Sequence, residues 1–156
     1  MIIRKAEEKD ITYIMKLLIQ VNNVHSLNRP DLFIYDKTKY KEIEVLNIIK
    51  DESTPVFVAV DDEDVVLGYA FCQFISHVKD NNFPDIVNLY IDDICVDEEA
   101  RGRSIGTKIY EFVKKFAKNN GCYNITLNVW DKNDSAMAFY KKCGFNIQKY
   151  GMEVII

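Results

Sequence analysis

The chain has 156 residues, of which 48% are hydrophobic and 28% charged, as in an ordinary globular domain. Its formal net charge of −4 argues against a broad nucleic-acid-binding surface. No apolar stretch is long enough for a signal peptide or a membrane span, so we expect one domain over residues 1–156 in the cytoplasm, with no nucleic-acid or membrane partner.

The cysteines and histidines predict neither a disulfide framework nor a metal centre. The cysteines stand singly without a Cys-x-x-Cys motif, and the two histidines lie far apart without the spacing of metal ligands. We therefore expect free thiols in a reducing compartment and no metal site. The cysteines are Cys72, Cys95, Cys122 and Cys143.

Hydrophobic periodicity predicts alternating strands and helices along the chain. Asp10 is expected to cap the first helix, Gly68 to mark a bulge, and the acidic run at residues 61–64 to form a solvated hairpin turn rather than a cation site. The expected elements are a strand at 2–4, a helix from 11, a loop or broken helix at 21–36, a helix at 37–50, strands at 56–60, 65–76 and 86–96, a helix at 105–117, a strand at 125–130, a helix at 133–142, and strands at 145–150 and 152–156.

Residues 101–107, Arg-Gly-Arg-Ser-Ile-Gly-Thr, indicate a phosphate site most clearly. They lie between a predicted strand and a predicted helix, so free backbone N–H groups and the positive end of the helix point to one place. Two arginines add positive charge there, which favours a pyrophosphate. The spacing of Gly102 and Gly106 fits neither the dinucleotide fingerprint nor the nucleoside-triphosphate loop.

This segment resembles the acyl-CoA turn of the GNAT family of N-acetyltransferases, written R/Q-x-x-G-x-G/A. Arg101 fills its first position and Gly106 its last, whereas Ser104 replaces the middle glycine and must adopt the backbone angles needed there. Residues 133–145 resemble the family's later motif, N-x-x-A-x-x-F/L-Y-x-x-x-G-F, with every named position filled. The resemblance extends over nearly the whole chain and is weakest at residues 22–49.

The resemblance implies an α/β fold with a single mixed, mainly antiparallel sheet flanked by helices. It also implies direct transfer of an acetyl group from acetyl-CoA to an amine, with strand main chain pairing with the pantetheine arm and residues 103–107 holding the pyrophosphate. The cofactor-binding residues that it implies are Ile94, Val96, Arg101, Gly102, Arg103, Ser104, Ile105, Gly106, Thr107 and Asn133.

Two residues are candidates for acid–base catalysis. Tyr140 is the candidate acid for the departing thiolate, because a phenol with a pKa of ~10 can protonate a thiolate whose acid has a pKa of ~8.5; the alternative is a packed aromatic. Asp92 is the candidate base acting through water, with a surface or capping carboxylate as the alternative. Asp93 is expected on the opposite face of the strand. Asn133 is expected to cap its helix, to contact the cofactor, or both.

The acceptor is the least determined part of the site. His25 and Phe33 are expected to contact it, because the family places its acceptor loop between the first two helices. A primary amine of a small molecule, such as a polyamine, aminoglycoside or amino-acid-like compound, is favoured over a protein N-terminus or lysine. The alternative from another class is a non-catalytic acyl-CoA-binding regulatory module. Either a monomer or a homodimer fits the sequence, and a dimer would use the edge strands near the C-terminus.

Overall fold

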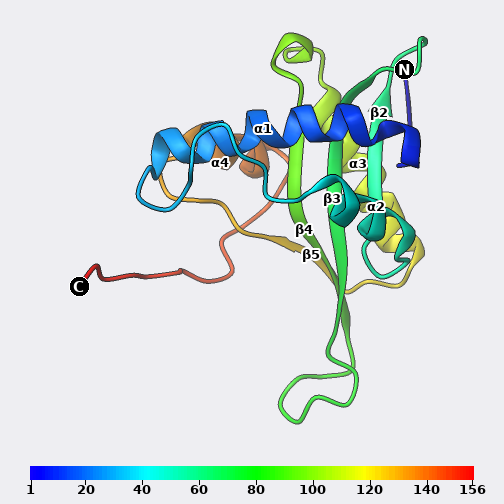
Figure 1. Cartoon of the computed structure of the whole chain (residues 1–156). Helices are drawn as coiled ribbons and strands as arrows, with labels where there is room; N and C mark the ends of the chain where they lie inside the picture. The colour runs from blue at the N-terminus through cyan, green and yellow to red at the C-terminus, as the bar shows by residue number, and fades with distance from the viewer.

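One five-stranded sheet organises the computed structural model, which describes all residues from 1 to 156 (Figure 1). Neighbouring strands from the first to the fourth are antiparallel, and the last pair is parallel. The predicted mixed, mainly antiparallel sheet is therefore confirmed. In their order across the sheet, the strands are β1 (Ile2–Lys5), β2 (Val56–Val60), β3 (Val66–Ser76), β4 (Val87–Val96) and β5 (Asn124–Leu127).

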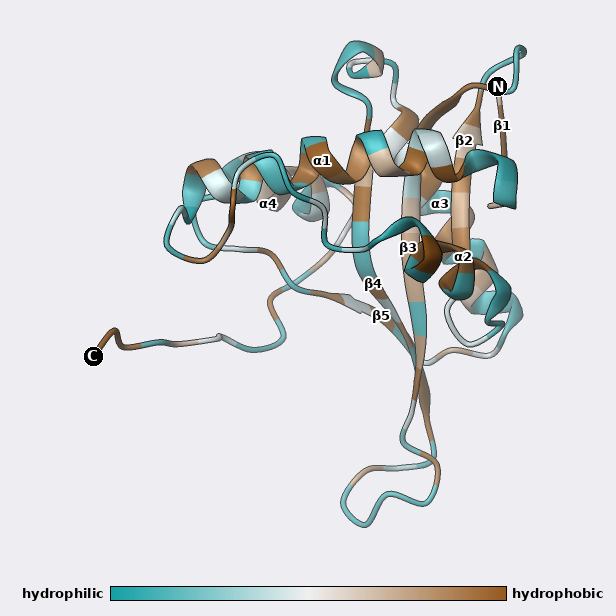
Figure 2. Cartoon of the chain, viewed as in Figure 1, coloured by the Kyte–Doolittle hydropathy of each residue, from teal (hydrophilic) through white to brown (hydrophobic).

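Helices cover both faces of the sheet. Residues of α1 and α2 form one buried cluster with Tyr69 and Phe71, while residues of α3 form a second cluster with Phe57 and Leu89. Figure 2 shows the hydrophobic colours concentrated in the strands and the helices around them. None of the helices combines the length and apolar character that crossing a membrane requires. The helices are α1 (Ile11–Asn28), α2 (Glu42–Lys50), α3 (Ile105–Asn119) and α4 (Asp134–Lys142), with short 3-10 turns at Glu8–Asp10 and Glu98–Ala100.

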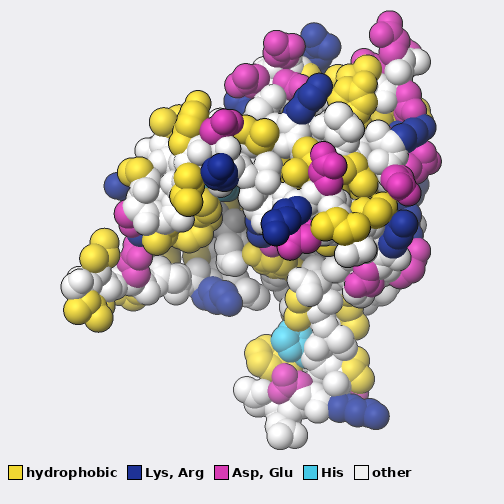
Figure 3. All heavy atoms as spheres, in the orientation of Figure 1, with side chains coloured by type: hydrophobic (Ala, Val, Ile, Leu, Met, Phe, Trp, Pro, Cys, Tyr) yellow, Lys and Arg dark blue, Asp and Glu magenta, His cyan; other side chains and the backbone are white.

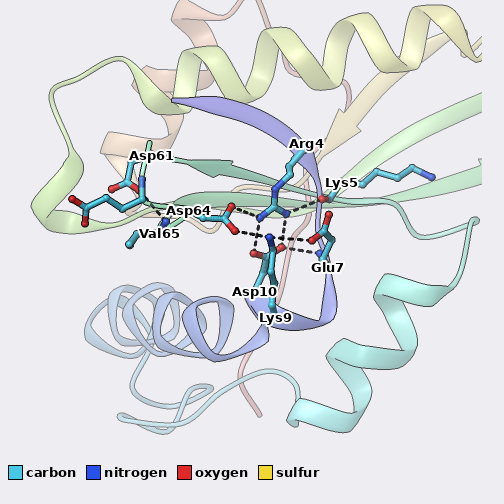
Figure 4. A network of polar contacts seen from close by, with 9 residues as sticks. Arg4, Lys5, Glu7, Lys9, Asp10, Asp61, Asp64 and Val65 are labelled. Carbon is cyan, nitrogen blue, oxygen red and sulfur yellow. Dashed lines mark hydrogen bonds and ion pairs between the residues drawn. The ribbon is translucent and has the colours of Figure 1, made fainter.

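A polar network attaches the start of α1 to the sheet (Figure 4). The Arg4 guanidinium donates to both oxygens of Asp10, at 2.6 and 2.9 Å, and also to Asp64 in the β2–β3 turn. Asp10 stands at the N-cap position of α1, but its carboxylate binds Arg4 and the Glu7 backbone N–H instead of capping the helix amides. The predicted cap is therefore a buried ion pair in the structure.

A bulge in β4 changes which face of the sheet its side chains occupy. Phe71 of β3 pairs with Asp93, but the next residue, Cys72, pairs with Ile91, so Asp92 is the extra residue. Ile91 therefore packs on the α3 side, whereas Cys95 packs on the α1 side.

Gly68 adjoins an irregularity in β3, close to where the sequence predicts a bulge. Gly68 pairs with Ala59 but Val66 pairs with Val60, so Leu67 is the extra residue. A Cβ atom at Gly68 would lie 2.7 Å from the carbonyl oxygen of Cys95, so this glycine allows β3 and β4 to approach closely.

Several predicted boundaries were wrong. Helix α1 continues to Asn28 where a loop or broken helix was expected, and α2 begins only at Glu42. The predicted strands at 145–150 and 152–156 are absent. Residues 146–156, which we call the C-terminal arm, are extended and leave the body of the molecule (Figure 1). Hydrophobic side chains near the end of the arm are exposed (Figure 3). Alternating apolar residues suit a strand, but a strand forms only beside a partner, and none pairs with this segment.

Candidate active site

Strands β4 and β5 separate after Ile91, the last residue of β4 that pairs with β5. The backbone of β4 beyond Ile91 therefore has no paired strand on its β5 side. A cavity of about 270 Å³ lies at this opening. The residues predicted for the site that line this cavity are His25, Asp92, Ile94, Asn133 and Tyr140.

The turn before α3 presents unused hydrogen-bond donors. Backbone N–H groups from Gly102 to Thr107 donate no hydrogen bond within the chain. Ser104 adopts left-handed backbone angles, φ 59° and ψ 21°. A glycine adopts such angles readily, so the serine takes a conformation typical of the glycine that it replaces in the motif. These free amides and the positive end of a 15-residue helix fit a pyrophosphate. Because Ile105 is buried, only its backbone can contact a ligand.

The two arginines of this turn differ in their contacts. The Arg101 Nε atom donates to the Val96 carbonyl oxygen at 3.3 Å, which connects the turn to the end of β4. Arg103 makes no hydrogen bond within the chain and is exposed, so its charge is available to an anion. A Cβ atom at Gly106 would lie 3.4 Å from the Phe139 ring and 3.5 Å from Val96, so α3 begins in close contact with α4.

Helix α4 places Tyr140 in the cavity wall. The Asn133 side chain accepts a hydrogen bond from the Ala136 backbone N–H at 3.2 Å, so it caps the helix, as one of its two predicted roles requires. The Tyr140 ring packs edge-on against Phe139 and Phe145, while its hydroxyl makes no hydrogen bond within the chain. Burial, and secondarily the charge of Asp93, raises the pKa of Tyr140 well above its usual value. The phenol therefore holds its proton at neutral pH, as an acid must.

Both carboxylates of the β4 bulge line the same cavity, so the prediction that Asp93 faces away from Asp92 was wrong. The Asp92 oxygens accept from Lys39 Nζ at 2.8 and 2.7 Å, and one also accepts from the Tyr40 hydroxyl at 2.8 Å. Asp93 accepts from the buried Tyr69 hydroxyl at 2.7 Å. Burial raises the pKa of Asp93 to about 6, despite the opposing hydrogen bond from Tyr69.

Aromatic side chains stand beside the carboxylates. The ring of Phe33 lies 5.1 Å from that of His25 and 5.1 Å from that of Trp130, the latter at 90°. His25 Nδ1 is buried without a hydrogen-bond partner, and burial, together with the charge of Lys39, lowers the pKa of this imidazole. His25 lines the cavity and belongs to α1 and not to a loop, whereas Phe33 only packs against it. Their expected contact with the acceptor stays a prediction.

Sequence reasoning missed Lys39 and Trp130 and misplaced Asp93. Lys39 lies in an irregular segment without periodicity, so no sequence pattern separates it from an ordinary surface lysine. Trp130 is the chain's single tryptophan, and this large aromatic in the loop before α4 was a usable signal.

The sequence matches the acetyltransferase (GNAT) family over residues 21–145, and the chain belongs to this family. It is 30% identical over 152 residues to thialysine N-epsilon-acetyltransferase of Bos taurus, covering 91% of this chain and 82% of the relative. It is 31% identical over 126 residues to glucosamine 6-phosphate N-acetyltransferase 1 of Dictyostelium discoideum, covering 76% and 74%.

Solved structures show the same fold. The tetramutant of BH1408 from Bacillus halodurans superposes with a TM-score of 0.94 at 29% identity, over 100% of both chains. Aminoglycoside N-acetyltransferase AAC(6')-Iy, in complex with CoA, superposes with a TM-score of 0.73 at 15% identity, over 99% of this chain and 98% of the other. This chain is therefore a GNAT-fold acetyltransferase, and acetyl-CoA is the donor that the family uses.

Proposed function

We propose that this acetyltransferase transfers an acetyl group directly from acetyl-CoA to a primary amine of a small molecule. The observation that carries the proposal is the convergence of Tyr140, Asp92 and Asp93 on one cavity, at the point where β4 has unpaired main chain. Donor binding, proton removal and proton donation then fall within a single site.

The donor would be held by backbone groups. The unpaired main chain at Ile94 and Val96 is suited to pair with the pantetheine amides as an added strand does. The free amides from Gly102 to Thr107 would bind the pyrophosphate, with the charge of Arg103 beside them. The Val96 carbonyl already accepts from Arg101, so its N–H is the group left for the donor.

The reaction needs a neutral amine and a protonated leaving thiol. Asp92, through water, takes a proton from the acceptor ammonium, and the amine nitrogen then attacks the thioester carbonyl carbon. The C–S bond breaks as the amide forms, and the departing sulfur takes the Tyr140 proton. The proton that the new amide nitrogen loses then returns Tyr140 to its protonated form. The cysteines play no covalent part, because burial raises the pKa of Cys72 and Cys95 to about 12 and neither is an activated nucleophile.

A small-molecule acceptor agrees with the names of the relatives, which act on thialysine and glucosamine 6-phosphate. Aromatic rings and carboxylates around the cavity suit an organic amine. A protein N-terminus or lysine is the alternative acceptor. All four cysteines are free thiols, which supports a cytoplasmic location.

Release of free CoA thiol from acetyl-CoA with a panel of amines tests the proposal. The panel should contain aliphatic diamines, amino acids, amino sugars and lysine-containing peptides. Turnover with one small amine supports the proposal, and turnover with the peptides alone favours a protein acceptor. Acetyl-CoA binding without turnover on any amine would instead identify a non-catalytic acyl-CoA-binding module.

A further inference from the structure

The chain places one of its own primary ammonium groups in the candidate acceptor site. Lys39 Nζ lies 2.8 and 2.7 Å from the two oxygens of Asp92, and both residues line the cavity that Tyr140 also lines. The Lys39 side chain is 51% exposed, and its backbone belongs to the irregular segment between α1 and α2. The ammonium can therefore swing into solvent without breaking a helix or strand.

Lys39 is suited to occupy the position of the acceptor ammonium beside Asp92, but not to accept the acetyl group itself. Burial acts to lower its pKa, but the hydrogen bond and charge of Asp92 outweigh burial, so the pKa is raised. Lys39 thus remains a cation at neutral pH and has no lone pair with which to attack a thioester.

Removing Lys39 from Asp92 leaves a partly buried carboxylate that needs a new cation. A ligand ammonium can replace Lys39 on Asp92 at little net expense, whereas a neutral or anionic ligand leaves the carboxylate unpaired. The same cavity offers His25 Nδ1, which is buried without a partner and can accept a hydrogen bond from a second donor on the ligand.

We propose that Lys39 is a displaceable occupant of the acceptor's ammonium subsite, and that cationic amines are selected because only they replace it on Asp92. This inference rests on the proposed function of the site and adds to it a substrate class, aliphatic ammonium compounds. It also predicts that the resting ion pair weakens acceptor binding.

The test compares Lys39→Met, which keeps the length of the side chain, with Lys39→Arg, which keeps its charge. Calorimetric binding of 1,4-diaminobutane to the CoA-bound protein is the first readout, and acceptor KM and kcat are the second. We expect Lys39→Met to bind the diamine roughly five-fold more tightly and to lower KM by a similar factor, with acetyl-CoA affinity unchanged. Lys39→Arg should resemble the parent protein.

Unchanged or weaker diamine binding by Lys39→Met overturns the displacement idea, since it would make Lys39 neutral or attractive to the ligand. Binding of the diamine is measured without turnover, so this outcome is distinct from failure of the proposed enzymatic function. Tighter binding together with no turnover on any amine would support the subsite and reject the proposed activity.

Discussion

The Tyr69 hydroxyl donates a 2.7 Å hydrogen bond to the Asp93 carboxylate, connecting β3 to the bulge of β4. Tyr69 is fully buried, while Asp93 keeps a partly exposed edge toward the cavity. Tyr69 is thus the one side chain that donates a hydrogen bond to Asp93, whereas Asp92 accepts from both Lys39 and Tyr40. The two adjacent carboxylates therefore differ in their chemistry.

Asp93 should make stability depend on pH. Burial raises its pKa to about 6 from an ordinary 3.8, so between these values the folded protein binds more protons than the unfolded chain. Its stabilising contribution is complete below pH ~4 and is lost as pH rises to ~6. Asp93→Asn keeps an acceptor for Tyr69 and does not titrate. We expect the free energy of unfolding of this variant, relative to the parent, to rise by about 2 kcal/mol over that interval.

Urea denaturation of both proteins at several pH values measures this difference, and Asp92→Asn serves as the neighbouring control. If the difference in the free energy of unfolding between the parent and Asp93→Asn stays constant from pH 4 to pH 7, Asp93 does not titrate near pH 6 in the folded state.

Asp92 should matter most for strongly basic acceptors. An amine with a pKa of ~10.4 is almost entirely protonated at pH 7, whereas one with a pKa near ~8 is about one-tenth neutral. We expect Asp92→Asn to lower kcat about 10²-fold for the first kind and much less for the second. Equal losses for both kinds of amine would show that Asp92 positions the acceptor without removing its proton.

The turn before α3, where we expect the pyrophosphate of acetyl-CoA to bind, can be tested at Ser104 and at Gly106. Ser104→Gly should stabilise the fold by about 0.5–1 kcal/mol, because φ of 59° strains a residue with a Cβ atom, and should leave acetyl-CoA affinity equal or better. A large loss of affinity would make the serine hydroxyl a ligand of the phosphate. Thermal unfolding and calorimetry give the two quantities.

Gly106→Asp should abolish acetyl-CoA binding, since it adds a negative charge where the pyrophosphate is expected. Gly106→Ala is the matched control, because its Cβ atom meets Phe139 at an ordinary 3.4 Å. Undiminished binding of acetyl-CoA by a folded Gly106→Asp variant would refute the proposed donor site.

Local patterns in the sequence were sufficient for most of the fold but not for its long-range geometry. The strong periodicity of α3 and the motif around α4 predicted both helices closely. The β4 bulge was not predictable, because Asp92 and Asp93 occupy an unbroken run and only pairing with β3 shows which residue is extra. The C-terminal arm carries a valid strand pattern, but pattern alone does not supply a pairing partner.

The same distinction applies to the site. Residues in motifs, such as Tyr140 and Asn133, both line the cavity, and their roles in binding and catalysis stay predictions. Lys39 comes to Asp92 from 53 residues away through an irregular segment, and no local pattern encodes that approach.

The network around Arg4 should be the most sensitive polar feature of the fold. Asp10 is 1% exposed, so Arg4→Met would leave a buried carboxylate without its cation (Figure 4). We expect a loss of about 3 kcal/mol in the free energy of unfolding. Asp64→Asn alters only the exposed partner of Arg4 and should have a small effect. Similar effects of the two substitutions on the urea midpoint would contradict this ranking.

Tyr140→Phe separates catalysis from packing at the candidate acid. The substitution keeps the ring and its contacts with Phe139 and Phe145 and removes a hydroxyl that has no partner within the chain. We expect acetyl-CoA affinity to stay within a few-fold, while kcat falls about 10²-fold. Single-turnover rates should be compared, because slow product release would hide a change in the chemical step.

A purely structural tyrosine predicts the opposite result, with a lower Tm and little change in the single-turnover rate. Because the pKa of Tyr140 is raised, the phenol stays protonated throughout the neutral range, so the parent rate should not fall through loss of this proton as pH rises to ~9. If Tyr140→Phe matches the parent in single turnovers, water protonates the thiolate and Tyr140 only shapes the cavity.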